Sequence, residues 1–139
     1  MGDKEKAEES LNKALKINPK SAAANFNMGL LKAEQNDLPK AEQYLRAALK
    51  EDPTLAVAAY NLCVITSKDR INEAVSFCKK AADLRPQEPK YAYTLAFYLN
   101  QKGDRDEAVR TLKAILVKYP DYKDAEMLLK EISKKEKRP

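Results

Sequence analysis

The chain has 139 residues, of which 44% are hydrophobic and 34% charged, with a net charge of +5 and no histidine. This length corresponds to one domain, and no run of about 18 apolar residues is present that would span a membrane. Because histidine is the commonest general base and a common metal ligand, its absence argues against catalysis. We therefore expect no enzyme, no metal site and no cofactor.

Four prolines recur at almost constant intervals of 34, 33 and 34 residues: Pro19, Pro53, Pro86 and Pro120. A fixed period near 34 indicates stacked repeats rather than one globular core. Alanine stands twelve residues before each proline, and apolar residues stand five and eight before it. These offsets share one helix face, so each proline follows a helix that it cannot continue.

In chain order, residues 4–17 are expected to form the second helix of a truncated repeat, after a turn at Gly2-Asp3. Three helical hairpins are expected at 21–53, 55–86 and 88–120, followed by a solvating C-terminal capping helix at 121–136 and a tail at 137–139. The missing partner of the first helix indicates a fragment of a longer protein. It also predicts an exposed apolar face on that helix, formed by Ala7, Leu11, Ala14 and Leu15.

Small residues recur where the two helices of each hairpin would approach most closely. The expected contacts are Gly29/Ala41, Cys63/Ala74 and Ala96/Ala108.

The turns inside the hairpins repeat as well. Residues that tolerate a left-handed backbone stand there, namely Asn36, Asp69 and Gly103, and likewise Gly2 in the first unit. Asp3, Asp37 and Asp104 follow as expected N-caps, and Asp104 with Glu107 has the spacing of a capping box. The third unit is one residue short, and we place the gap near Lys68-Asp69.

Both cysteines, Cys63 and Cys78, occupy core positions of the same hairpin. We interpret them as buried free thiols that act as small hydrophobes. A disulfide between them is conceivable, but Cα atoms of packed helices often lie beyond the limit of about 7 Å. Two thiols alone do not make a zinc site.

The stretch from Lys130 to Pro139 holds five basic and two acidic residues, and we expect a frayed, solubilising end rather than a nucleic-acid surface.

The whole arrangement resembles the tetratricopeptide repeat (TPR) family, whose pattern is W-x2-L-G-x2-Y, then A-x3-F, then P. The first full unit reads Asn25-x2-Met28-Gly29-x2-Lys32, then Ala41-x3-Leu45, then Pro53. The tryptophan place holds Asn25, Ala59 and Ala92. The resemblance implies an all-α solenoid, a right-handed superhelix of antiparallel hairpins. The stretch 85–96 also resembles the TPR tails of some bacterial proteins, which suggests a bacterial parent.

In such a solenoid the first helices line a concave groove. The residues left on these helices once the core is assigned are Phe26, Asn27, Leu30, Tyr60, Asn61, Val64, Lys90, Tyr93, Thr94 and Phe97. Asparagine amides can bond a peptide backbone, and aromatic rings offer contact area at low entropic cost. The groove therefore suits an extended peptide or an amphipathic helix. Alternatively, the aromatic side chains only pack neighbouring first helices together.

Some TPR domains hold a C-terminal carboxylate with a lysine–asparagine clamp. Asn27, Asn61 and Lys90 match places in that clamp, but Phe26, Leu30 and Thr94 depart from it, so a complete clamp is not expected. The predicted function is a protein-interaction scaffold that binds a partner protein or peptide, with no nucleic acid and no membrane as partner. The alternative is a structural segment that associates with itself through residues 4–17.

Overall fold

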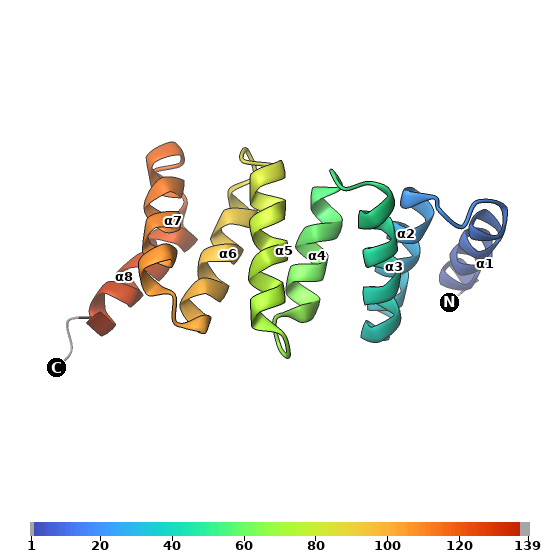
Figure 1. Ribbon diagram of the computed structural model, residues 1–139, viewed down its shortest axis with the longest axis horizontal. Coiled ribbons are helices and arrows are strands. Elements are labelled where there is room, and N and C mark those ends of the chain that lie inside the picture. The colour runs from blue at the N-terminus through green and yellow to red at the C-terminus, as the bar shows by residue number, and fades with distance from the viewer. Residues whose placement is uncertain (1, 137–139) are drawn as a thin grey trace.

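The computed structural model describes residues 2–136 and shows a row of α-helices (Figure 1). The expected tail at 137–139 lies outside the described residues. Eight helices are present within them, and no strand. Their bounds are α1 Gly2–Ile17, α2 Ala22–Glu34, α3 Leu38–Glu51, α4 Ala56–Thr66, α5 Ile71–Leu84, α6 Pro89–Lys102, α7 Arg105–Lys118 and α8 Lys123–Glu136. The expected all-α solenoid is confirmed.

The helices are arranged in two layers. Each helix packs against its neighbours in the chain, and α6 also contacts α8. In Figure 1, α3, α5 and α7 stand in front, while α2, α4, α6 and α8 run behind them. The first helices of the hairpins thus share one layer and the second helices share the other. Of the helices in the described part of the chain, none is long and apolar enough to cross a membrane.

The core follows the repeat. Of the alanines that stand twelve residues before the prolines, Ala41, Ala74 and Ala108 are completely buried, whereas Ala7 on α1 is exposed. At Gly29 the two backbones approach so closely that an added Cβ would lie 2.8 Å from Cγ of Leu45 and 3.3 Å from the carbonyl oxygen of Ala41. Small residues at these positions therefore allow the close contact that the sequence predicts.

The turns differ from one hairpin to the next. Asn36 (φ 61°) and Gly103 (φ 101°) adopt the left-handed backbone, as expected. Asp69 does not, so that prediction is wrong. In this shorter unit α4 ends at Thr66, and the amide of Arg70 donates to the carbonyl oxygen of Thr66 at 2.8 Å. The missing residue is thus absorbed by a tighter turn that needs no positive φ.

The expected N-caps also behave differently. The Asp37 carboxylate accepts from the amide of Lys40 at 3.3 Å, as a cap should. Asp104 stands at the N-cap of α7 but makes no capping hydrogen bond there. Its carboxylate instead lies 3.3 Å from Nζ of Lys102, so the expected capping box does not form. Gly2 and Asp3 lie inside α1 rather than in a turn.

The interpretation of the two cysteines as free thiols is wrong. Cys63 on α4 and Cys78 on α5 are joined by a disulfide, with their Cα atoms 5.2 Å apart. Both are completely buried. The close approach of α4 and α5 explains the difference, because Cys63, Ala74 and Cys78 are buried in one core cluster and the two cysteine Cα atoms lie within the disulfide limit of about 7 Å.

Candidate peptide-binding surface

The predicted groove residues lie on three helices of one layer. Phe26, Asn27 and Leu30 lie on α2, and Tyr60, Asn61 and Val64 on α4. The remaining four, Lys90, Tyr93, Thr94 and Phe97, lie on α6. All three helices belong to the layer of first helices, in which the sequence predicts the groove.

The structure brings part of this set together where α4 meets α6. The Tyr60 hydroxyl lies 3.4 Å from Oγ1 of Thr94. Because the Thr94 hydroxyl already donates to the carbonyl oxygen of Lys90 at 2.8 Å, we assign Tyr60 as the donor. Nζ of Lys90 stands 4.9 Å from the centre of the Tyr60 ring, a cation–π distance. Tyr60, Lys90 and Thr94 therefore form one junction between successive repeats.

The next junction lies between α6 and the segment that leads into α8. The rings of Tyr93 and Tyr122 pack edge to face with their centres 6.0 Å apart. Burial raises the pKa of both hydroxyls above the usual value for tyrosine, and the nearby Asp124 carboxylate adds to this effect. Both phenols are therefore neutral at physiological pH. Phe26 on α2 packs against the core cluster that includes Leu45 and Leu49 of α3.

The sequence left two interpretations open for the aromatic residues: contact with a ligand, or packing between neighbouring first helices. Phe26, Tyr60 and Tyr93 are half-buried, and each packs against an adjacent core cluster. The aromatic side chains thus do pack the first helices together. Part of each ring remains open to solvent.

Four members of the set are more exposed, whereas Leu30, Asn61 and Thr94 are half-buried. The side chains of Val64 and Phe97 are 43% and 40% exposed, and Asn27 and Lys90 are exposed as well. The Asn61 amide donates one hydrogen bond to the carbonyl oxygen of Val57 at 2.9 Å, which leaves its oxygen and second N–H available. Apolar and amide groups therefore face solvent along the same layer.

Two tyrosines belong to this surface although the sequence analysis did not select them. Tyr122 contacts Tyr93, and the Tyr91 ring lies 4.8 Å from that of Tyr60, tilted by 31°. Tyr91 stands five residues after Pro86, where the other units have alanine: Ala24, Ala58 and Ala125. A tyrosine at an otherwise alanine position was the available signal.

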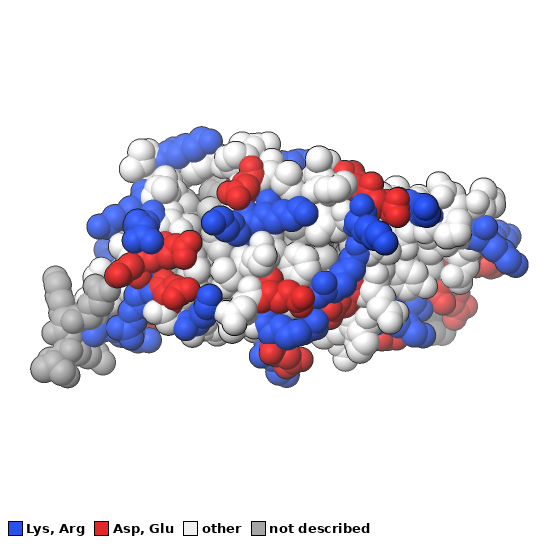
Figure 2. Space-filling view, in the orientation of Figure 1, with Lys and Arg blue, Asp and Glu red and all other residues white. Residues whose placement is uncertain are grey.

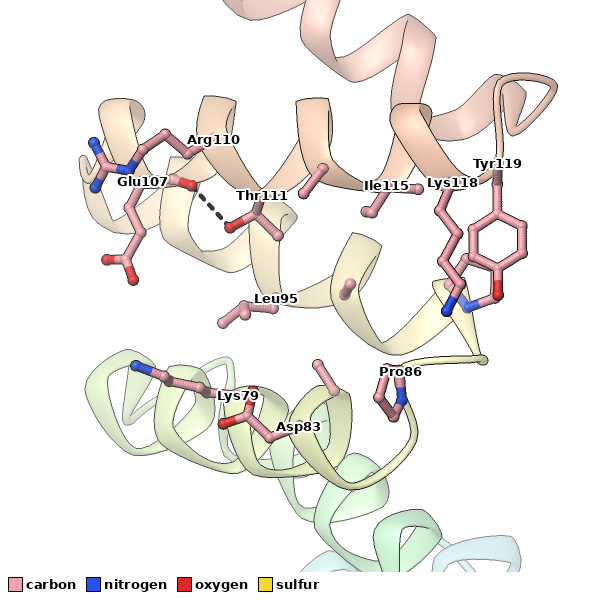
Figure 3. A pocket seen from close by; sticks show the side chains of 14 residues that line it. Lys79, Asp83, Pro86, Leu95, Glu107, Arg110, Thr111, Ile115, Lys118 and Tyr119 are labelled. Atoms are coloured by element: carbon pink, nitrogen blue, oxygen red, sulfur yellow. Dashed lines mark hydrogen bonds between the residues drawn. The ribbon is translucent and has the colours of Figure 1, made fainter.

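A separate cleft lies away from the predicted groove. It has a volume of about 490 Å³ and opens between α5 and α7, with α6 as its floor (Figure 3).

The described residues hold no group of three or more histidine, cysteine or carboxylate side chains placed to bind a metal ion.

Comparison with known proteins identifies the repeat. Two tetratricopeptide repeat family models match the chain, one over residues 1–61 and the other over residues 67–135. No curated protein sequence matches it significantly.

Solved structures are similar in fold. A crystal structure of MamA is 26% identical with a TM-score of 0.72, and the match covers 79% of this chain and 61% of that one. YrrB, described as a TPR protein with an unusual peptide-binding site, is 21% identical with a TM-score of 0.83 over 96% of this chain and 72% of its own. PilF of Pseudomonas aeruginosa is 22% identical with a TM-score of 0.80, and the match covers 97% of this chain and 62% of that one.

The chain thus spans 61% of the length of the MamA structure that it matches. The family models together cover nearly all of the repeat pattern, and the solved structures share the helical solenoid. This protein belongs to the tetratricopeptide repeat family.

Proposed function

We propose that this TPR protein is a scaffold that binds an extended peptide or an amphipathic helix of a partner protein along α2, α4 and α6. The observation that carries the proposal is the exposure of amide and apolar side chains at matching positions of successive first helices. Asn27 and Asn61 stand one repeat apart, as do Val64 and Phe97. The peptide-binding site described for YrrB supports the same class of ligand.

In this proposal the polar and apolar groups have different roles. Asn27 and Asn61 bond the ligand backbone, and each such bond contributes about 0.5–1.5 kcal/mol net. Val64 and Phe97 receive apolar side chains of the ligand. Tyr60 holds Lys90 over its ring, where the ammonium group can meet a ligand carboxylate.

The partner is first identified by affinity capture with the chain, followed by mass spectrometry. Calorimetric titration of the captured segment then tests the surface. Asn61→Ala should weaken binding by about two- to tenfold, which corresponds to one backbone hydrogen bond. Val64→Glu should weaken it more, because it places a charge in an apolar contact.

Lys113→Ala is the matched control, because this exposed lysine lies on α7 in the other layer. It should leave the affinity unchanged. If Asn61→Ala and Val64→Glu bind as tightly as the native protein while both stay folded, the ligand lies elsewhere.

The second candidate function is self-association through residues 4–17, favoured by one observation on α1. This helix has no buried residue: Leu11 and Leu15 are only half-buried, and Ala7 is exposed. A second copy that covers Leu11 and Leu15 would bury this face. Sedimentation should then show a dimer or larger species that Leu11→Glu with Leu15→Glu converts to monomer, whereas a native monomer at high concentration would exclude it.

A further inference from the structure

The cleft on the outer layer has apolar walls and an apolar floor. α5 contributes one wall with Ala82, α7 the other with Ile115, and α6 the floor with Ala92 and Leu95 (Figure 3). α7 crosses the cleft from Glu107 to Lys118, which corresponds to about 16 Å of helix. An extended segment of about five residues has that length.

The same place one repeat earlier, between α3 and α5, is filled. Counted from the repeat prolines, Leu49 on α3 corresponds to Ala82 on α5, and Phe77 on α5 corresponds to Thr111 on α7. Leu49 and Phe77 pack together with Ala81 in one core cluster. The open cleft therefore lies where two large apolar side chains are replaced by alanine and threonine.

The floor shows the same difference. Leu62 of α4 is completely buried beneath the filled position, whereas its counterpart Leu95 of α6 is 8% exposed. Ala59 is completely buried, and its counterpart Ala92 is only half-buried. Apolar surface that is covered in one repeat thus remains open to solvent in the next, and covering it would be favourable.

The charges around the two places differ as well. Between α3 and α5, Arg46 contacts Glu42 at 2.8 Å and Glu73 at 2.7 Å, and Arg70 joins the same two carboxylates. The guanidinium carbon of Arg46 also lies 5.1 Å from the centre of the Phe77 ring. Figure 2 shows basic and acidic side chains interspersed with uncharged surface on this side of the molecule.

Around the open cleft the charged side chains of the described residues form no ion pairs, although Nζ of Lys118 lies 5.6 Å from the centre of the Tyr119 ring. Lys79 corresponds to Arg46 in the repeat. None of the five charged residues on the rim forms a salt bridge within the described part of the chain. They are Lys79, Asp83, Glu107, Arg110 and Lys118. Three of these are cations and two are anions, so the rim has a net charge of +1, and a ligand carboxylate can pair with Lys79 or Lys118.

We propose that the outer cleft between α5 and α7 binds an acidic segment of a partner protein that inserts a phenylalanine and a leucine side chain. The filled position between α3 and α5 is the template: there a phenyl ring and a leucine occupy the space, and Glu42 pairs with Arg46 above the ring. In the next repeat the counterpart of Glu42 is Val75, so the ligand would supply this carboxylate to Lys79, and a second one to Lys118.

The probe is a fluorescein-labelled peptide with blocked ends and the sequence Gly-Glu-Phe-Glu-Leu-Glu-Gly. In an extended chain its phenylalanine and leucine point to one side and its central glutamate to the other. Fluorescence anisotropy should show saturable binding, and the NMR signals of Ala82, Leu95 and Ile115 should shift on addition. Peptides with both apolar residues changed to alanine, or all glutamates changed to glutamine, should bind at least about tenfold more weakly.

The sharpest test refills the cleft with side chains of the protein itself. Ala82→Leu with Thr111→Phe places the two large side chains of the filled repeat in the cleft and should reduce peptide affinity by about tenfold or more. Lys118→Glu, on an exposed side chain, should also weaken binding and reduce its dependence on salt. Lys113→Glu reverses a charge on α7 outside the cleft and is the matched control.

Each outcome decides the proposal. Loss of binding in the refilled and Lys118→Glu variants, with retention in Lys113→Glu, supports it. No binding of the probe to the native protein, or equal binding to all the folded variants, overturns it. This cleft is independent of the proposed first-helix surface, because Asn61→Ala should leave binding of the probe unchanged.

Discussion

At the scale of single residues, Gly29 shows how two opposite effects can be weighed. Alanine is intrinsically favoured over glycine inside a helix by about 1 kcal/mol. At Gly29, however, a Cβ would lie 2.8 and 2.9 Å from two carbon atoms of Leu45, which is itself completely buried. Overpacking of this kind costs about 1–3 kcal/mol, so the steric effect should exceed the gain in propensity.

We therefore expect Gly29→Ala to lower the free energy of unfolding, and Gly29→Leu to lower it further, as measured by urea denaturation. Gly2→Ala is the control, because a Cβ added there meets no atom within 4 Å. A Gly29→Ala protein that is as stable as the Gly2→Ala protein would show that α2 and α3 separate easily.

The ring and the hydroxyl of Tyr60 are expected to contribute differently to the stability of the fold. Its hydroxyl bonds Thr94, and its ring packs on Tyr91 and lies under Lys90. Outward-facing aromatic residues would contribute little to stability, but the packing of Tyr60 between repeats predicts a real loss for Tyr60→Ala. Tyr60→Phe should cost only about 0.5–1.5 kcal/mol, the value of one hydrogen bond. Thermal denaturation of the two variants distinguishes the stability that the ring contributes from that of the hydroxyl. Equal melting temperatures of Tyr60→Ala and Tyr60→Phe would contradict this prediction.

At the scale of the elements, the hairpin of α4 and α5 is the one that carries a covalent link. The disulfide closes a loop between cysteines 15 residues apart. In the chain-entropy model such a loop restricts the unfolded chain and stabilises the fold by about 3 kcal/mol. Reduction, or replacement of both cysteines by alanine, should lower the urea midpoint accordingly. Air-oxidised protein unfolded without reductant should not react with iodoacetamide; full labelling of both cysteines would contradict the link.

The contact between α3 and α5 depends on pH. The Arg70 guanidinium, which bonds Glu42, lowers the pKa of that carboxyl from 4.5 to about 2, and Arg46 adds to the effect. Because the folded pKa lies below the unfolded one, Glu42 stabilises the fold at pH values above about 4.5. This contribution is lost as the pH falls towards 2.

The matched variant is Glu42→Gln, which cannot titrate at this position. Urea denaturation should show the native protein to be more stable than the variant at neutral pH. The difference between them should shrink as the pH falls through the window from 4.5 to about 2. A difference that stays constant over this window would mean that the ion pairs contribute no pH-dependent stability.

At the scale of the whole molecule, the solenoid is held together by contacts between neighbouring repeats, so its stability should vary along its length. α1 packs mainly against α2 and has no buried residue, whereas α4 has six. Its amide hydrogens should exchange with solvent faster than those of α4 to α6 in hydrogen-exchange mass spectrometry. Protection of α1 equal to that of α4 would instead indicate that another molecule covers it.

The sequence by itself determined the helices, the hairpins and their closest contacts. These follow from local signals: a period near 34, apolar residues at helical spacing, small residues at Gly29 and Ala41, and prolines that end helices. Even the shorter turn near Asp69 could be located, because one residue is missing from that unit. The four groove positions on α6 and the six on α2 and α4 were likewise placed on the correct helices by counting.

Only the tertiary structure decided what depends on distances between helices. The sequence placed Cys63 and Cys78 in one hairpin, but the spacing of α4 and α5 determines that they can join. It left open whether Tyr60 faces a ligand or packs neighbouring first helices, and the approach of α6 makes it part of a junction. The outer cleft required both layers, because a cavity exists only where side chains from α5, α6 and α7 together fail to fill the space between them.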